Sequence, residues 1–308
     1  MRTGGPWSPW AWETSLGRDA SVLSRVLRAL RPRGPGFEES VQRLAGHGRD
    51  HVVGWVDMPE GVVGGALEGF AGHGLAVRDL RADPAAFRAF LAEAGYEKRW
   101  PRYYGANLPE KAFEHWVVLQ VLAPGPGDVL IDVASDNSPL PEIAERLTGA
   151  SACRQDIRYR PGLRGKTIGG DACRMPVPDG FAQKASLTCS FEHFEGGSDL
   201  GLFQELARVL RPGGRVCVVP FYVTSQHANQ TDPEVRVGGD VAFDPGARLY
   251  LARGWGNRFG RFYSPASFVE RVVAPTLDRF EFEIIHLAGA ADVDPAIYAR
   301  LAFLATRR

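Results

Sequence analysis

The chain has 308 residues, of which 44% are hydrophobic and 10% aromatic, so it can bury a core large enough for one big domain or two smaller ones. Its 36 Lys and Arg residues balance its 36 Asp and Glu residues, which leaves no net positive charge to attract nucleic acid or an anionic membrane. No apolar run approaches the roughly 18 residues that cross a bilayer. We therefore expect a cytoplasmic protein whose partner is a small molecule.

The four cysteines, Cys153, Cys173, Cys189 and Cys217, stand singly and without CxxC spacing. This pattern argues against a zinc site and against a disulfide framework. We expect reduced thiols in the core and no bound metal.

The first hundred residues differ in texture from the rest. Apolar residues at helical spacing predict a helix over residues 20–31, and further helices are expected over 37–46 and 83–96, the last with Asp83 as N-cap and Pro84 at the first helical position. Residues 51–58 are typical of a strand. We interpret 1–100 as an accessory or cap region; a dimerisation or packing appendage without ligand contact is an equal alternative.

From residue 101 onward, apolar strands and amphipathic helices alternate, which is typical of a parallel sheet covered on both faces. A helix starting at Ser264 and Pro265 is followed by two strand-like segments, 280–289 and 297–308, with no long helix between them. Neighbouring strands without a crossover helix pair antiparallel. We predict a doubly wound, mostly parallel, seven-stranded α/β sheet with an antiparallel C-terminal edge strand, over residues 101–308.

The segment GDVLIDVASDNSPLPEI, residues 127–143, predicts a buried strand, a tight turn and the start of a helix. This arrangement is how α/β folds build a site for a nucleotide-like ligand. No glycine occurs in the turn, where Ala134, Asp136 and Ser138 stand instead.

Residues 103–308 resemble the class I S-adenosylmethionine-dependent methyltransferases. Asp132 ends the first strand, Asp156 in CRQDI ends the second, and Asp171 lies in GGDACRMPVPDGF; LARVLRPGGRVCVVP is similar to a later family segment. The resemblance implies S-adenosyl-L-methionine as cofactor, with Asp156 accepting hydrogen bonds from both ribose hydroxyls and Asp171 touching the adenine amino group. The implied cofactor-binding residues are Asp132, Ala134, Ser135, Asp136, Ser138, Asp156, Ile157, Asp171, Ala172 and Ser190.

The replaced glycines decide whether the turn still works. Ser138 with Pro139 can cap the next helix, and Asp136 belongs to the residues that best tolerate a left-handed backbone. The Asp136 carboxylate has three open alternatives: it pairs with the cofactor's ammonium group, it repels the cofactor's carboxylate, or it hydrogen-bonds its own turn and points away.

The candidate catalytic base is His193 in SFEHFEG, which follows the predicted fourth strand between Glu192 and Glu195. An imidazole can take the proton of a hydroxyl acceptor, and a carboxylate neighbour can hold its tautomer. Packing or a cofactor contact is the alternative role.

Candidate substrate-binding residues come from two segments. Tyr104 precedes the helix that enters the fold, where a lid role competes with core packing. The loop GWGNRFGRFYSP contributes Trp255, Asn257, Arg258 and Arg261, which suit stacking and bidentate hydrogen bonding. They favour a small or glycan-like acceptor.

We therefore predict a methyltransferase that acts on an acceptor oxygen, with a homodimer as a possible assembly. The alternative is a non-catalytic protein with the same fold that serves as a binding or structural partner. A dinucleotide-dependent dehydrogenase is excluded because the turn lacks the G-x-G-x-x-G pattern.

Overall fold

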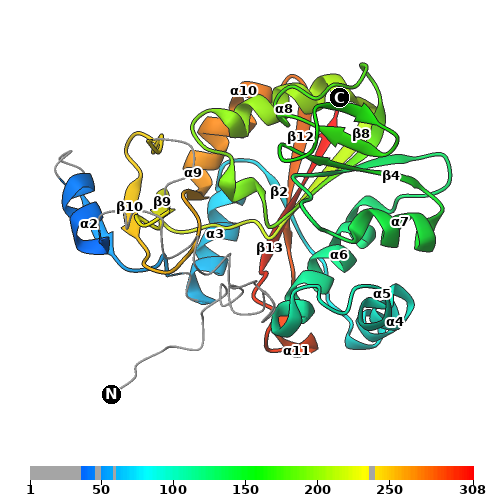
Figure 1. The fold of residues 1–308 in the computed structure, drawn as a ribbon, viewed down its shortest axis with the longest axis horizontal. Coiled ribbons are helices and arrows are strands. Elements are labelled where there is room, and N and C mark those ends of the chain that lie inside the picture. The colour runs from blue at the N-terminus through cyan, green and yellow to red at the C-terminus, as the bar shows by residue number, and fades with distance from the viewer. Residues whose placement is uncertain (1–35, 46–49, 58–59, 236–239) are drawn as a thin grey trace, which may run out of the picture.

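The computed structural model describes residues 36–45, 50–57, 60–235 and 240–308. These residues form a large sheet with helices on both faces and, beside it, a small four-stranded sheet (Figure 1). The helix expected over residues 20–31 lies outside the described residues. Within the described part of the chain, no helix is both long and apolar enough to cross a membrane.

The large sheet has nine strands in the order β2-β12-β13-β8-β7-β3-β4-β6-β5. Its strands are β2 (Ala76–Asp79), β3 (Val129–Val133), β4 (Ser151–Asp156), β5 (Gly162–Arg164), β6 (Thr167–Gly169), β7 (Ala182–Thr188), β8 (Leu210–Val219), β12 (Phe280–His286) and β13 (Leu301–Arg307). The predicted α/β fold class is confirmed. Seven strands were expected, and the two additional ones, β2 and β5, are the edge strands. Both have only three or four residues, too few to show a sequence period.

The C-terminal strand β13 pairs antiparallel with β12, as predicted, but it does not lie at the sheet edge. Its other side pairs antiparallel with β8, where Phe303 is opposite Val218. The edge beyond β12 is taken by β2, which pairs with it in parallel. The predicted edge position of the C-terminal strand is therefore wrong, because β13 lies between β12 and β8 and pairs with both.

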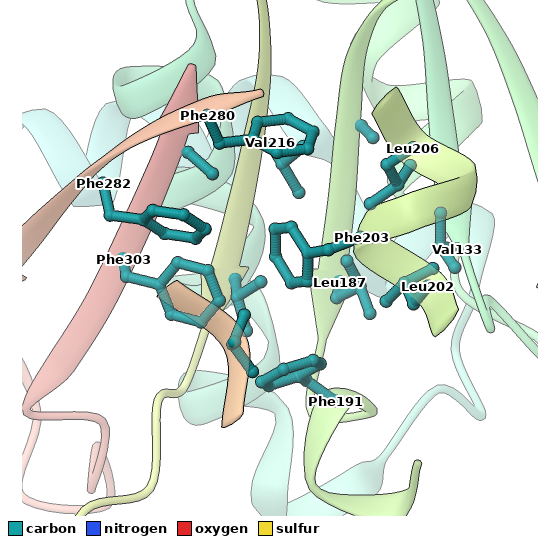
Figure 2. Packing of buried hydrophobic residues seen from close by; sticks show 14 of the residues in the cluster. Val133, Leu187, Phe191, Leu202, Phe203, Leu206, Val216, Phe280, Phe282 and Phe303 are labelled. Carbon is teal, nitrogen blue, oxygen red and sulfur yellow. The ribbon is translucent and has the colours of Figure 1, made fainter. Parts of the chain in front are cut away.

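Each face of the sheet has its own apolar core, because side chains alternate along the strands. In β8, Val216 and Val218 belong to one core, and Cys217 and Val219 to the other. Figure 2 shows the first core, where phenylalanines of β12 and β13 meet Phe203 of α8. The rings of Phe203 and Phe280 are 5.6 Å apart at 86°, an edge-to-face contact.

The helices cover the two faces in two groups. On the side of the first core lie the helices α3 (Glu60–Gly72), α8 (Ser198–Val209), α9 (Pro265–Phe268) and α10 (Ala274–Thr276) and the π-helix η4 (Val269–Val273) (Figure 1). On the side of the second core lie α4 (Pro84–Ala94), α5 (Tyr96–Arg99), α6 (Leu108–Leu122), α7 (Leu140–Thr148) and α11 (Ala290–Val293). Two short 3-10 helices, η2 (Gly105–Asn107) and η3 (Phe191–His193), lie in connecting segments.

The predicted helix starts are confirmed at two positions. Asp83 Oδ1 accepts the N–H of Ala85 at 2.7 Å at the start of α4. Ser264 caps α9 in a capping box with Ser267. Helix α7 begins at Leu140, one residue later than predicted, although Ser138 Oγ still accepts the Leu140 N–H.

The small sheet has the order β1-β10-β9-β11, with β1 (His51–Val53), β9 (Ala228–Thr231), β10 (Arg248–Leu251) and β11 (Gly260–Phe262). Helix α2 (Phe37–Ala45) packs on β10 through Phe37, Leu249 and Leu251. Since β1 pairs with β10 and β2 pairs with β12, strands from before residue 101 enter both sheets. A domain boundary after residue 100 stays a prediction.

Candidate active site

A cavity of about 580 Å³ opens at the carboxyl ends of β3, β4 and β7, beside the start of α6. Open α/β sheets bind their ligands at this edge. The cavity brings together most of the predicted site residues, namely Tyr104, Ala134, Ser135, Asp136, Ser138, Asp156, Ile157, Asp171, Ala172, Ser190, His193 and Asn257. Tyr104 and Asn257, which are 153 positions apart in the sequence, thus line one cavity.

The turn after β3 adopts the backbone that glycines usually provide. Ala134 has φ 52° and Asp136 has φ 43°, both in the left-handed region. Hydrogen bonds from β4 hold the turn: the Gln155 side chain accepts from Ala134 N at 3.1 Å, and Asp156 Oδ2 accepts from Asp136 N at 3.0 Å. The turn therefore keeps its shape without glycine, at a conformational cost that these contacts offset.

Asp156 lies at the end of β4 with only 5% of its surface exposed. One carboxylate oxygen accepts the Arg158 N–H at 2.8 Å, and the other accepts the Asp136 N–H. An ionised carboxylate offers about four lone-pair positions. Two backbone donors use half of them, and the others remain for hydroxyl groups of a ligand in the cavity.

The Asp136 carboxylate does not fill the cavity. It pairs with Arg158 Nη1 at 2.7 Å, and both side chains are at least half exposed at the rim. The alternative in which this carboxylate hydrogen-bonds its own turn is therefore wrong, because its partner is a residue of the loop after β4. The two alternatives that involve the cofactor stay predictions. The backbone oxygen of Asp136 also accepts the Tyr159 hydroxyl.

Ile157 and Asp171 line the same part of the cavity. The Ile157 side chain is 72% exposed, which is unusual for a large apolar residue and provides a flat apolar surface for a ring. Asp171 Oδ1 accepts the N–H of Cys173 at 2.9 Å, which fixes the loop after β6.

Asp132 does not reach the cavity. It is wholly buried behind the turn, where its Oδ1 accepts the Ser186 hydroxyl at 2.9 Å. Burial raises the pKa of Asp132 to about 7 from an ordinary 3.8, although the hydrogen bond from Ser186 acts in the opposite direction. Its position supports the turn and gives it no direct contact with a ligand in the cavity.

His193 ends η3 and lies on the cavity wall. Its Nδ1 is 2.7 Å from the carbonyl oxygen of Phe259, and because a carbonyl only accepts, Nδ1 carries the proton. Neutral His193 therefore has its lone pair on Nε2, which is 3.6 Å from Glu192 Oε1. This tautomer is compatible with the predicted base.

The predicted acceptor loop is mostly turned inward. Asn257 lines the cavity, but Trp255 is buried against Gly260 and packs beside His193. The Arg258 guanidinium donates to Glu195 at 2.8 and 2.9 Å.

Arg261 is wholly buried. Its three nitrogens donate to Asp244 and to the carbonyl oxygens of Phe194 and Gly196. Arg261 therefore has a structural position in place of the predicted acceptor contact, since every nitrogen is engaged inside the protein. The predicted acceptor contact of Arg261 is wrong because its partners lie elsewhere in the sequence, where no local pattern reveals them.

The sequence did not single out Lys111 and Glu114, which face the cavity from the first turns of α6. Lys111 Nζ donates to Glu114 Oε1 at 2.7 Å, and the two side chains are only 5% and 1% exposed. Gln155, Arg158 and Cys189 also line the cavity without having been predicted. A signal existed in LPEKAFEHW, where four ionisable residues interrupt a helix that otherwise has a core-like composition.

Backbone strain gathers around the cavity. Among the described residues, five that are not glycine have a positive φ, and four of them line the cavity: Tyr104, Ala134, Asp136 and Cys189. Such conformations persist where the surroundings determine them, and they cluster at functional sites.

Comparison with known proteins finds a methyltransferase domain in the chain. Residues 138–218 match the family model described as a methyltransferase domain. Demethylmenaquinone methyltransferase of Mycobacterium sp. (strain JLS) is 29% identical over 169 residues, which are 50% of this chain and 72% of the relative. The proteins with that name from strains KMS and MCS match equally.

Two solved structures are also similar. The 1,6-didemethyltoxoflavin-N1-methyltransferase of Burkholderia thailandensis has a TM-score of 0.42 and 12% identity, covering 74% of this chain and 91% of that one. Geranyl diphosphate C-methyltransferase of Streptomyces coelicolor A3(2) has a TM-score of 0.40 and 13% identity, covering 64% and 80%.

The fold is that of the class I methyltransferases, as the sequence predicted. The chain is an S-adenosyl-L-methionine-dependent methyltransferase, so the predicted enzyme type and cofactor are confirmed. The non-catalytic alternative raised by the glycine-free turn is set aside.

Proposed function

We propose that the enzyme transfers a methyl group to a hydroxyl oxygen of a small-molecule acceptor inside the 580 Å³ cavity. The observation that carries this proposal is the chemical difference between two sets of residues that line the cavity. At the end of β4 and after β6 are Asp156, Ile157 and Asp171, which suit a nucleoside and form the cofactor side. Before and within the start of α6 are Tyr104, Lys111 and Glu114, which suit a polar acceptor on an aromatic surface and form the acceptor side.

The cofactor side fits S-adenosyl-L-methionine. Asp156 has lone pairs left for the two ribose hydroxyls, Ile157 offers an apolar surface to the adenine ring, and Asp171 can accept from the adenine amino group. When bound, the cofactor supplies a methyl group activated by a sulfonium. The protein contributes orientation, which alone supplies a large share of the acceleration for two aligned reactants.

On the acceptor side, the evidence favours a small molecule. The relatives are named for demethylmenaquinone, itself a small molecule. The glycan-like acceptor rested on Trp255, Arg258 and Arg261, and these side chains are buried or paired inside the protein. An acceptor hydroxyl also needs a base, and two groups on the cavity wall can serve: His193 and Glu114.

Calorimetric titration with S-adenosylhomocysteine tests the proposal. We expect the wild type to bind, and Asp156→Asn to bind at least tenfold more weakly, because one acceptor oxygen becomes a donor amide. Asp179→Asn, on the exposed side of the protein, is the control and should bind as the wild type does. Urea unfolding of each variant confirms folding. A folded wild type that does not bind, or an unchanged affinity in Asp156→Asn, would contradict the proposed site.

A further inference from the structure

The buried ion pair of Lys111 and Glu114 lies in a group of charges that do not balance. The carboxyl groups of Glu110 and Glu192 interact electrostatically with Glu114, so the group holds three carboxyl groups and one ammonium group. All four side chains are at most 5% exposed. Lys111 acts on Glu110 and Glu114, while Glu192 Oε1 lies 3.6 Å from His193 Nε2. Buried charges are normally paired one to one, because each unpaired charge loses its hydration without compensation.

Several oxygens of this group have no hydrogen-bond partner among the described residues. They are Glu110 Oε1, both carboxylate oxygens of Glu192 and the hydroxyl of Tyr298. Native proteins leave few buried polar atoms in this condition. Lys111 and Glu114 line the cavity, so a ligand there would contact the two members of this charged group that face it.

We propose that the Lys111–Glu114 pair is the place where the acceptor hydroxyl binds and loses its proton, an inference that rests on the proposed methyl transfer. The acceptor oxygen lies beside the Lys111 ammonium group. Its O–H bond breaks, the proton goes to the Glu114 carboxylate, and the bonding electron pair stays on the oxygen, where the positive charge of Lys111 stabilises it. That pair is the nucleophile in methyl transfer.

Glu114 suits this step better than His193. Burial raises the pKa of Glu114 well above its ordinary value, with the charge of Glu110 adding to the effect, while Lys111 opposes it. A higher proton affinity makes the carboxylate a stronger base. His193 Nε2 instead faces Glu192, and its side chain is about a third exposed to solvent, which competes for its lone pair.

The chemistry of the pair also limits the class of acceptor. A carboxylate removes a proton efficiently only from a hydroxyl of comparable acidity, so an ordinary alcohol is too weak an acid. Phenols and enols meet this condition. The rings of Tyr103 and Tyr104, whose centroids are 4.6 Å apart, provide an aromatic surface beside Lys111. We assign the acceptor to this class.

The coloured phenol 4-nitrocatechol tests the inference, because its visible spectrum distinguishes the neutral from the ionised form. The wild type, with and without S-adenosylhomocysteine, is titrated with the probe at a series of pH values on both sides of the probe's own first ionisation. We expect the bound probe to become the anion at a lower pH than the free probe does. In Glu114→Gln the ratio of ionised to neutral bound probe should fall at least tenfold, while His193→Gln, on the same wall, keeps the wild-type ratio.

Two results would overturn the inference. One is a wild type that binds no probe or binds it without lowering the pH at which it ionises. The other is a spectral shift that survives in Glu114→Gln and is lost in His193→Gln, which would assign the proton to His193. Calorimetry with S-adenosylhomocysteine separates these from a failure of the cofactor site, since Glu114→Gln should keep the wild-type affinity within twofold.

Discussion

Two groups of buried charges in this enzyme are built in opposite ways. The Arg261 network consists of Arg261, Arg271, Asp199, Asp244 and His227, and its two guanidinium groups face two carboxylates in direct contact. The Lys111 cluster consists of Lys111, Glu110, Glu114 and Glu192, with three carboxyl groups for one ammonium group.

Hydrogen bonding is also more complete in the Arg261 network than in the Lys111 cluster. Asp244 accepts from Arg261, His227 and Asn229, and Asp199 accepts from Tyr263 and Arg271. These bonds join the small sheet to α8 and η4. In the Lys111 cluster, by contrast, carboxylate oxygens of Glu110 and Glu192 remain without a hydrogen-bond partner among the described residues, and the other two members, Lys111 and Glu114, line the cavity. Complete pairing indicates a structural role, and incomplete pairing indicates a site prepared for a ligand.

The largest expected effect is in the Arg261 network. Asp244→Asn removes one carboxylate from between two guanidinium groups and leaves buried positive charge without compensation. We expect the free energy of unfolding to fall by about 3–5 kcal/mol. Urea unfolding measures it, with Asp240→Asn as a control at an exposed position. A loss below about 1 kcal/mol would mean that the network is not structural.

The same kind of substitution in the Lys111 cluster should affect catalysis and spare stability. Glu114→Gln removes one of three carboxyl groups, so the unfolding free energy should change by less than about 1 kcal/mol, because like-charge repulsion decreases. The initial rate of methyl transfer to 4-nitrocatechol should fall on the order of 10²-fold or more. Wild-type rates should rise with pH through the raised pKa of Glu114, since the base must be ionised. A variant with the wild-type rate would remove Glu114 from the mechanism.

Other ionisable groups interact with Glu114 or with Lys111, and their ionisation contributes to the same pH profile of the rate. Burial raises the pKa values of Glu110, Cys189, Tyr104 and Tyr298, while the negative neighbours raise that of Lys111 despite burial. Lys111→Met therefore separates the effect of the Lys111 charge from that of the Glu114 base. The variant should lower the rate of methyl transfer and move the pH at which this rate rises. An unchanged profile would exclude an electrostatic role of Lys111.

Asp132 is a third kind of buried charge, alone beneath the turn. Its folded-state pKa of about 7 lies above the ordinary 3.8, so the stability it contributes is fully present below pH 3.8 and is lost as the pH rises to 7. Asp132→Asn does not lose stability in this pH range, because its amide does not ionise. Relative to the wild type, the variant should gain unfolding free energy between pH 4 and 7, on the order of 2–3 kcal/mol. A difference that does not vary with pH would show that the raised pKa is wrong.

The smallest expected effect concerns the turn itself. Ala134 has a left-handed backbone, which costs an L-residue roughly 1–2 kcal/mol. Glycine avoids this cost, but its greater conformational freedom in the unfolded chain offsets part of the gain. Ala134→Gly should therefore stabilise the protein by up to about 1 kcal/mol. Ala144→Gly, inside α7, is the matched control and should destabilise it by about 1 kcal/mol or more. Equal effects at both positions would mean that Ala134 is not strained.

Most of the fold and of the cofactor side was predictable from the sequence. Apolar periods showed the alternation of strands and helices, and Asp156 ends a predicted strand at the sheet edge where ligands bind. Asp171 was found through the family resemblance of its segment, and it lines the same cavity. The acceptor side was not predictable to the same extent. A charged pair such as Lys111 and Glu114 is usually a solvated helix face, and only the packing around α6 shows that it is buried.

The loop containing Trp255 and Arg261 gave the opposite error. Its residue types are typical of an exposed binding loop, but Arg261 finds Asp199 and Asp244, 62 and 17 positions away in the sequence, and turns inward. Local sequence carries no signal for partners at such separations. Likewise, the edge strand β2 pairs with β12, which lies 207 positions further along the chain at the pair Ala76 and Glu283.

A crystal structure of the enzyme with S-adenosylhomocysteine tests the central claim most directly, because it shows which wall of the cavity each part of the ligand touches. We predict that the ribose hydroxyls lie within hydrogen-bonding distance of Asp156, the adenine ring packs on Ile157, and the sulfur faces the Lys111–Glu114 pair. A ligand bound outside this cavity, or with its adenosine against Lys111 and Glu114, would contradict the account.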